Sequence, residues 1–447
     1  MAARTHTFQP PKGTRDFYPQ DLAVRRYIES VWREVSINHG FEEIDGPTFE
    51  HLDLYTVKSG PDIVSELFSF RRAGGDVDYA LRPEFTPTLA RMYAAQAGSL
   101  PNPTKWFSIG PFFRAERPQR GRLREHIQWN LDIIGDDSSD ADAEVIAVAV
   151  ESIQRLGIPS KDVTVKISHR ELVAGALSGA GLDQQQIEPA MLLLDRKERM
   201  PKAAFDTECR AIGLDHDQYE DVIDRESGVI NDAIRAQEQG QSRQAPRENG
   251  SAAERLLQLV DALASLTVLR WCEFDLNVVR GLAYYTGTVF EIHETTGKER
   301  AIAGGGRYDN LVEMFGGPPT PACGFAMGDV VLRLVLEDRG LLKAAQEWAP
   351  RPDAFVISAG KDEAEKQFRP LVAKLRREGL HARHSYRSTR NVGKLLGEAA
   401  KARARYAVIL GDELKDGNVV LKDLDGGKQE NVKLDDLATM LRERQRQ

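Results

Sequence analysis

FFRAERPQRGRLREHIQWNLD, residues 112–132, is the stretch of sequence that decides the fold. Two adjacent aromatic residues suggest a strand, on which two-residue alternation would place Arg114 and Glu116 on one face. The turn at 117–121 leads to a second strand, so the segment predicts an antiparallel hairpin that carries charge. Charged groups on the floor of a cleft need partners, and an arginine there suits a phosphate. A solvated hairpin face is the alternative interpretation.

The composition is that of an ordinary globular chain. Its 447 residues exceed the usual size of one domain, which predicts two or three separate hydrophobic cores. No stretch reaches the apolar length of a membrane span, and the first residues lack the apolar core of a secretory signal. We therefore expect a cytoplasmic protein that does not bind membranes. Three widely separated cysteines argue against a zinc knuckle or a disulfide framework.

Charge is distributed unevenly along the chain. The net charge is −8, yet residues 352–447 hold 20 Lys and Arg against 15 Asp and Glu, a net of +5. Within residues 381–405, seven basic residues accompany a single acid, Glu398. Such a stretch is either a solvated helix surface or a patch that follows a phosphate backbone.

Apolar periodicity predicts the elements of the first part of the chain. Residues 22–39 have apolar positions at helical spacing, Gly40 ends this helix, and Phe41 begins a strand. Short strand patterns alternate with helical ones from 79 to 135, and residues 141–156 predict a longer helix. These segments are expected to form one folded core.

A helical segment and a second core follow. Residues 170 to about 265 have helical spacing and few strand formers, which predicts a helical insertion. Inside it, residues 239–250 lack apolar periodicity and predict a mobile loop. Strand patterns return at 272–279 and 289–293. After the break at Ala-Pro-Arg-Pro, residues 349–352, an α/β pattern has strands at 354–358, 381–385 and 406–410.

Common nucleotide and metal motifs are absent from the sequence. No Gly-x-x-x-x-Gly-Lys-Ser/Thr string occurs, and the glycines at 304–306 do not complete a dinucleotide fingerprint. The pair His381 and His384 is weak as a metal signal, and we assign no metal ligand to it. Neither a P-loop enzyme nor a typical dehydrogenase is supported.

The hairpin resembles motif 2 of class II aminoacyl-tRNA synthetases, and four further segments make the chain similar to the histidyl-tRNA synthetase family. These segments are LRPEFTP at 81–87, RGLAYYTG at 280–287, GGGRYD at 304–309 and GFAMG at 324–328. The resemblance covers nearly the whole chain. It implies an α+β catalytic domain with an antiparallel sheet at residues 1–169 and 266–345. It also implies a helical insertion at 170–265 and a C-terminal α/β anticodon-binding domain at 351–447.

The resemblance implies ATP-dependent activation of L-histidine to histidyl-adenylate and transfer to the 3′ end of tRNA. Arg114 and Arg280 would then hold the α-phosphate as catalytic residues, Glu116 would contact ATP with them, and Mg²⁺ would accompany ATP. The implied histidine-binding residues are Glu84, Thr86, Gln128, Asp132, Tyr285 and Tyr308. The glycines at 304–306 would allow the backbone to approach the ligand closely.

Partners are implied in the same way. The helix and strand at 22–47 resemble motif 1, which predicts a homodimer. The tRNA candidates are Arg117 and Gln119 for the acceptor end, and Arg383, Arg387, Arg390 and Lys394 in the C-terminal part. Two other functions are considered: a synthetase-like regulatory subunit of histidine biosynthesis, and a tRNA-binding module without catalysis. The paired arginines and the C-terminal domain favour the enzyme.

Several positions depart from the family pattern. Val331 stands where the third motif has an arginine that holds the γ-phosphate, and Arg333 follows two positions later. These two positions share one side of a strand but not of a helix, so the sequence does not decide whether Arg333 substitutes. Asp132, Ala283 and Phe85 replace a glutamate, an aspartate and a glycine, which indicates a divergent subgroup.

Overall fold

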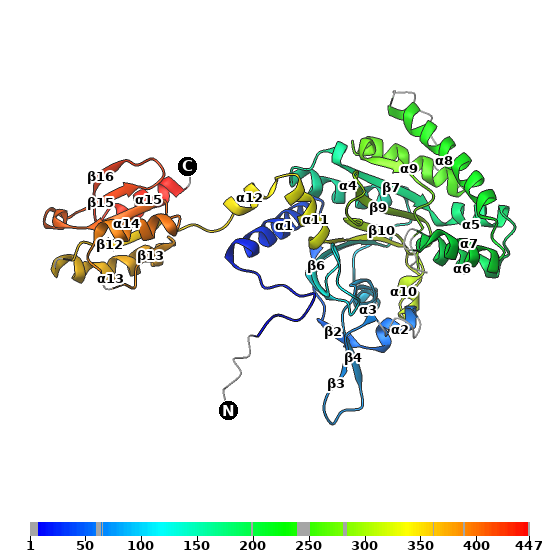
Figure 1. Ribbon diagram of the computed structural model, residues 1–447, viewed down its shortest axis with the longest axis horizontal. Coiled ribbons are helices and arrows are strands. Elements are labelled where there is room, and N and C mark those ends of the chain that lie inside the picture. The colour runs from blue at the N-terminus through cyan, green and yellow to red at the C-terminus, as the bar shows by residue number, and fades with distance from the viewer. Residues whose placement is uncertain are drawn as a thin grey trace. The chain divides into compact units, whose positions relative to one another are not determined.

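The computed structural model describes residues 8–59, 64, 66–197, 200–238, 251–279, 284–360, 362–387 and 389–445. The chain divides into two compact units, Met1–Trp348 and Ala349–Gln447. Figure 1 shows both as mixtures of helices and strands. Among the described residues, no helix has both the length and the apolar character needed to cross a membrane.

An eight-stranded sheet organises the first unit. Its inner strand pairs are antiparallel, and the pair at each edge, β1 with β5 and β7 with β8, is parallel. In spatial order the strands are β1 (Glu42–Glu43), β5 (Thr104–Phe113), β6 (Glu125–Ile134), β11 (Ala322–Gly328), β10 (Ala303–Arg307), β9 (Thr288–Glu294), β7 (Val163–His169) and β8 (Cys272–Phe274). The hairpin predicted around residues 112–132 is therefore present as β5 and β6. The prediction that Arg114 and Glu116 share one face of a strand is wrong, because β5 ends at Phe113 and both residues lie in the loop between the two strands.

Helices cover one face of this sheet and form the main core with it. Trp32 of α1 stacks on Trp129 of β6, with ring centroids 5.7 Å apart. The Ser138 hydroxyl caps α4 by accepting a hydrogen bond from the Ala141 amide. The covering helices are α1 (Pro19–Asn38), α4 (Ser139–Arg155), α9 (Ala252–Ser265), α11 (Asp329–Asp338) and α12 (Leu342–Glu347). The helices predicted at 22–39 and 141–156 are confirmed as α1 and α4.

The opposite face carries smaller elements. A second apolar cluster joins α3 to Phe112, Ile134 and the tyrosines at 284, 285 and 308. Beside it lies a three-stranded sheet. These elements are α2 (Asp53–Ser59), α3 (Thr86–Gln96), α10 (Leu311–Met314), β2 (Phe49–His51), β4 (Asp78–Leu81) and β3 (Ser69–Arg71).

The predicted helical segment is present between β7 and β8. Four of its helices share a separate core that includes Leu177, Ile187 and Tyr219. They are α5 (Arg170–Gly179), α6 (Gln184–Asp195), α7 (Lys202–Ala211) and α8 (His216–Glu238). Figure 1 shows them in green at one end of the sheet. The fifth helix, α9, instead packs on α4 in the main core. The loop predicted at 239–250 lies outside the described residues.

One strand prediction in this region is wrong in extent. The pattern at 272–279 predicted one strand, but β8 ends at Phe274. Leu276 and Val279 are buried in the core of α5–α8 instead of continuing the sheet. Their apolar side chains are therefore explained by helix packing. Short 3₁₀ helices lie at Ser160–Asp162 and Leu269–Trp271.

The second unit is a five-stranded sheet with helices. Three parallel strands match the predictions at 354–358, 381–385 and 406–410, and two antiparallel strands, which the sequence patterns missed, extend the sheet. In spatial order they are β13 (Ala382–His384), β12 (Ala354–Ser358), β14 (Tyr406–Leu410), β15 (Asn418–Asp423) and β16 (Gln429–Lys433). The helices are α13 (Asp362–Arg377), α14 (Val392–Lys401) and α15 (Leu437–Gln445), with a 3₁₀ turn at Asp412–Asp416.

Candidate functional site

Strand alternation on β6 separates core residues from site residues. The odd-numbered side chains from Ile127 to Ile133 are buried in the core beneath α1 and α4. Their even-numbered neighbours therefore face the other side of the sheet. These are His126, Gln128, Asn130 and Asp132, a polar row on a strand that is largely buried.

Glycines form the floor beside this row. Gly328 pairs with Gln128 in the register of β11 and β6, and Gly324 pairs with Asp132. A Cβ atom on Gly324 would lie 2.2 Å from a carboxylate oxygen of Asp132, so no larger residue fits there. A Cβ atom on Gly328 would meet nothing within 4 Å, so this glycine borders open space. Small residues thus let a ligand lie directly on the sheet.

Asp132 lies at the buried end of the polar row, among tyrosines. The Tyr308 hydroxyl donates a hydrogen bond to its carboxylate, and the Tyr308 ring meets the rings of Tyr284 and Tyr285 edge to face. Burial raises the pKa of Asp132 to about 7, although the hydrogen bond from Tyr308 opposes this shift. Three of the residues predicted to contact histidine, Asp132, Tyr285 and Tyr308, are thus brought together.

The segment before α3 lies against the end of β5. Buried Arg82 holds it there, because its guanidinium donates hydrogen bonds to the carbonyls of Pro111 and Gly46 and pairs with Asp45. Arg114 donates a hydrogen bond from Nε to the Pro83 carbonyl, at 3.4 Å, next to Glu84. Glu84, Thr86 and Arg114 are all half-buried. Gln128 donates from its side-chain amide to Asn130 at 2.7 Å.

The loop between β5 and β6 is fixed by ion pairs. Arg122 pairs with Glu116, and Arg124 donates to the Glu116 carbonyl at 3.2 Å. Arg120 pairs at 2.5 Å with Glu299, whose side chain is almost completely buried. Arg117 and Gln119, the predicted acceptor-end contacts, are exposed on the same loop. The loop therefore offers both a fixed base and accessible polar side chains.

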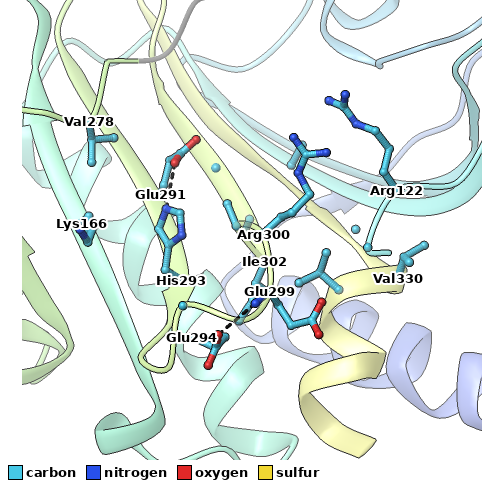
Figure 2. Close-up of a pocket in the computed structure, with 18 of the residues that line it drawn as sticks. Arg122, Lys166, Val278, Glu291, His293, Glu294, Glu299, Arg300, Ile302 and Val330 are labelled. Atoms are coloured by element: carbon cyan, nitrogen blue, oxygen red, sulfur yellow. Dashed lines mark hydrogen bonds and ion pairs between the residues drawn. The ribbon is translucent and has the colours of Figure 1, made fainter. Parts of the chain in front are cut away.

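A pocket of about 1080 Å³ opens above the sheet. Arg114 and Gln128 line it, whereas Asp132, Tyr285 and Tyr308 are not among its lining residues. Figure 2 shows Glu291 and His293 of β9 together on one side of the pocket and Arg122 and Arg300 on another. Its charged lining residues also include Lys166, Asp195, Glu273, Asp275, Glu294, Lys298 and Glu299. A mixed charge distribution of this kind suits a polar, charged ligand.

Sequence reasoning missed most of this lining. Lys166 and Glu291 are paired in the register of β7 and β9, and Lys166 forms an ion pair with Asp275 at 2.8 Å. Charged residues at alternate positions of β9, Glu291 and His293, are the signal that could have revealed them. His126 also lines the pocket, and burial together with the charge of Arg114 lowers the pKa of its ring to about 4.

The structure answers the question about Arg333. Residues 329–338 form the helix α11, so positions 331 and 333 point in different directions. Val331 lines the pocket, whereas Arg333 pairs with Asp21 of α1 at 2.7 Å. Arg333 is therefore not placed to replace the arginine missing at 331. Arg280, the second predicted catalytic arginine, lies outside the described residues.

One cluster among the described residues has the spacing of a metal site, at His216, Asp217 and Glu220 of α8. The ammonium group of Lys197 already lies 2.6 Å from the Glu220 carboxylate, so a positive charge of the protein itself pairs with this cluster. The cluster lies in the helical segment and shares no residue with the pocket. We assign it no role in catalysis.

The second unit carries the predicted tRNA residues on one segment. All four residues are exposed, and they run from the middle of β13 to the first turn of α14: Arg383, Arg387, Arg390 and Lys394. Tyr386, which sequence reasoning did not single out, lies among them with 89 % of its surface exposed. Its ring centroid is 4.6 Å from that of His384. An exposed aromatic ring among arginines is the arrangement on which unpaired nucleic-acid bases stack.

Both units of the chain match known protein families. Residues 13–329 match the histidyl-tRNA synthetase family, and residues 353–444 match the anticodon binding domain. The chain is 39 % identical to a histidine–tRNA ligase of Halobacterium salinarum, over 94 % of each chain. It is 38 % identical to that of Opitutus terrae, over 98 % of each.

Solved structures give the same fold. The histidyl-tRNA synthetase from Nostoc sp. PCC 7120 superimposes with a TM-score of 0.77 at 25 % identity, covering 98 % of this chain and all of that one. The Staphylococcus aureus histidyl-tRNA synthetase gives a TM-score of 0.71 at 25 % identity, covering 97 % of this chain and all of that one. With family matches over both units and relatives that span the whole chain, this protein belongs to the histidyl-tRNA synthetase family.

Proposed function

We propose that the protein is a histidine–tRNA ligase, which activates L-histidine with ATP to histidyl-adenylate and transfers histidine to the 3′ end of its tRNA. The similarity of the whole chain to histidine–tRNA ligases carries this proposal. The alternative, a regulatory subunit of histidine biosynthesis, is disfavoured because residues 353–444 match an anticodon binding domain, which points to tRNA as a partner.

The proposed activation step joins two anions. A carboxylate oxygen of histidine attacks the α-phosphorus of ATP and forms a new P–O bond. The bond between the α-phosphorus and the oxygen that bridges to the β-phosphate breaks, and pyrophosphate leaves with its electron pair. Negative charge grows on the α-phosphate oxygens in the transition state, and fixed cations stabilise it. We assign this role to Arg114, which lines the pocket, and to Arg280. We also propose that Glu116 contacts the adenine. Its ion pair with Arg122 fixes it in position.

Histidine selection is proposed for the buried end of the polar row. The carboxylate of Asp132 would accept a hydrogen bond from the imidazole, while Tyr308 and Tyr285 would enclose the ring. An amino acid without a matching hydrogen-bond donor would leave this buried carboxylate unpaired, and that cost weakens its binding. Glu84, Thr86 and Gln128 would hold the α-amino group.

Mg²⁺ is proposed to enter with ATP. The pocket contains carboxylate oxygens, the donors that Mg²⁺ prefers, on Glu273 and Glu291. Both residues neighbour Lys166 in the register of β7, so they lie on the same side of the sheet. When bound, the ion would neutralise part of the triphosphate charge.

tRNA contacts are proposed on both units: Arg117 and Gln119 for the acceptor end, and Arg383, Arg387, Arg390 and Lys394 for the anticodon region. Their exposure supports this proposal.

A homodimer is proposed as well. The small sheet presents Phe49 and Phe70, 50 % and 43 % exposed, in contact with Tyr79. A clustered aromatic surface of this kind suits a protein partner. The domain boundaries and a cytoplasmic location stay predictions.

Histidine-dependent exchange of pyrophosphate into ATP tests the proposed function. The full-length protein should catalyse exchange with histidine and not with the other amino acids, and it should charge tRNA. Arg114→Ala and Arg280→Ala should each remove the exchange without loss of the fold, because they delete transition-state cations. A protein without histidine-dependent exchange would contradict the proposal.

A further inference from the structure

The triphosphate end of ATP needs a cation that α11 does not supply. The residues of α11 that line the pocket are Val330 and Val331, which carry only methyl groups toward it. Arg333, the nearest cation on this helix, is held by Asp21 on α1. A polyanion bound above α11 would thus meet apolar side chains from this helix, so its charge must be balanced from another element.

Arg300 belongs to the loop between β9 and β10 and lies beside the apolar surface of Val330 and Val331. A Cβ atom on Gly121 would be 3.3 Å from Val331 Cγ2 and 3.8 Å from Arg300 Cδ, so both side chains border the same point of the β5–β6 loop. Arg300 lines the pocket together with Arg114. Figure 2 shows the guanidinium groups of Arg300 and Arg122 extending to the same side.

The β9–β10 loop is held rigidly enough to position a side chain. The Glu294 carboxylate accepts hydrogen bonds from the amides of Thr296, Lys298 and Glu299, and from the Thr296 hydroxyl. Burial opposes the ionisation of Glu294, but these hydrogen bonds outweigh it and hold the pKa at about 2. The carboxylate therefore stays charged and keeps the turn closed at any physiological pH.

The same loop is anchored to the motif 2 loop. Glu299, with a side chain 2 % exposed, pairs with Arg120 at 2.5 Å, and the Ile302 amide donates to the Ile292 carbonyl at 2.7 Å. Arg300 thus follows a residue that is fixed to the hairpin carrying Arg114. A cation on a closed, anchored turn is preorganised, which is what phosphate binding in a pocket requires.

We propose that Arg300 binds the β- and γ-phosphates of ATP and so supplies from the β9–β10 loop the charge that is missing at position 331. The planar guanidinium donates two parallel hydrogen bonds to phosphate oxygens, which a lysine cannot reproduce. This assignment deepens the proposed ligase function and rests on it, since it concerns the triphosphate of the same ATP.

Comparison of ATP with AMP isolates the proposed contact. AMP retains the adenine and the α-phosphate but lacks the two phosphates assigned to Arg300. In the full-length protein, Arg300→Ala should weaken ATP binding in calorimetry and raise KM for ATP in pyrophosphate exchange by about 10- to 100-fold. AMP binding should change by less than about threefold, because its contacts remain. Arg333→Ala, the matched control, removes an arginine outside the pocket and should leave both nucleotides unaffected.

A rescue experiment tests whether charge, rather than structure, is responsible. Adding Val331→Arg to Arg300→Ala returns a guanidinium to the same place and should restore at least part of the preference for ATP over AMP. Equal weakening of ATP and AMP, or an unchanged KM for ATP in Arg300→Ala, would overturn the proposal. The binding assay needs no histidine or tRNA, so it remains decisive if the wild type fails to exchange pyrophosphate and the ligase function itself is wrong.

Discussion

Asp132→Asn should make the fold more stable above neutral pH while it destroys the proposed histidine site. The pKa of Asp132 is raised from the ordinary 3.8 to about 7 because the carboxylate is buried. Ionising it in the folded state therefore costs about 4 kcal/mol relative to the unfolded chain. Between these two pKa values the folded state holds one proton more than the unfolded state, so stability falls as pH rises.

The expected magnitude follows from these values. From pH 5 to pH 8 the wild type should lose about 2.5 kcal/mol of unfolding free energy through Asp132 alone, and the Asn variant should lose none of it. Other groups titrate in both proteins, including His126 and His169, whose pKa values burial lowers to about 4. Their contributions cancel in the difference between variant and wild type, so this difference is the quantity to measure.

Urea unfolding followed by tryptophan fluorescence provides the assay. All five tryptophans precede residue 349, so the signal reports on the first unit. Asp137→Asn, which removes an exposed carboxylate shortly after β6, is the control and should keep the wild-type slope. Parallel pH slopes for Asp132→Asn and wild type would refute the burial argument. In pyrophosphate exchange, the Asn variant should lose at least about 100-fold in kcat/KM for histidine.

Three further predictions use other parts of the chain. A protein ending at Trp348 should keep pyrophosphate exchange and lose tRNA charging, because each unit has its own core; equal charging by both forms would contradict the proposed role of the second unit. Tyr386→Ala should raise KM for tRNA about 5- to 100-fold with exchange unchanged, whereas Tyr386→Phe should retain stacking. Arg307→Ala should destabilise the first unit by about 3 to 5 kcal/mol in urea unfolding, since it leaves buried Asp142 without its 2.9 Å ion-pair partner.

Local patterns in the sequence were enough to predict the main elements. The aromatic pair at 112–113 and the turn at 117–121 predict the hairpin, but they extend the first strand too far, because β5 ends at Phe113. Helical spacing identified α9 as a helix but not the core it joins, since periodicity carries no information about which surface covers an apolar face. The 272–279 pattern failed for the same reason: Leu276 and Val279 pack in a helical core that their neighbours in sequence do not reveal.

The pocket lining was less accessible to sequence reasoning. Motifs located Arg114 and Asp132, but Lys166, Glu291 and Arg300 line one pocket only because β7, β9 and β10 pair in the sheet. The position of the Arg333 side chain is set by its ion pair with Asp21, about 310 residues earlier in the chain. Contacts of this range depend on the tertiary fold and leave no local periodicity.

The pairing of β6 with β11 has a consequence for synthesis on the ribosome. Ala322 follows its partner Ile134 by about 190 residues. The edge of β6 that pairs with β11 therefore stays unpaired until β11 has left the ribosome. At translation rates of about 5 to 20 residues per second, this delay lasts about 10 to 40 s. An unpaired edge is a template for aggregation, and polar or charged side chains facing inward discourage such pairing. Gln128, Asn130 and Asp132 would thus protect the nascent chain long before a ligand reaches them.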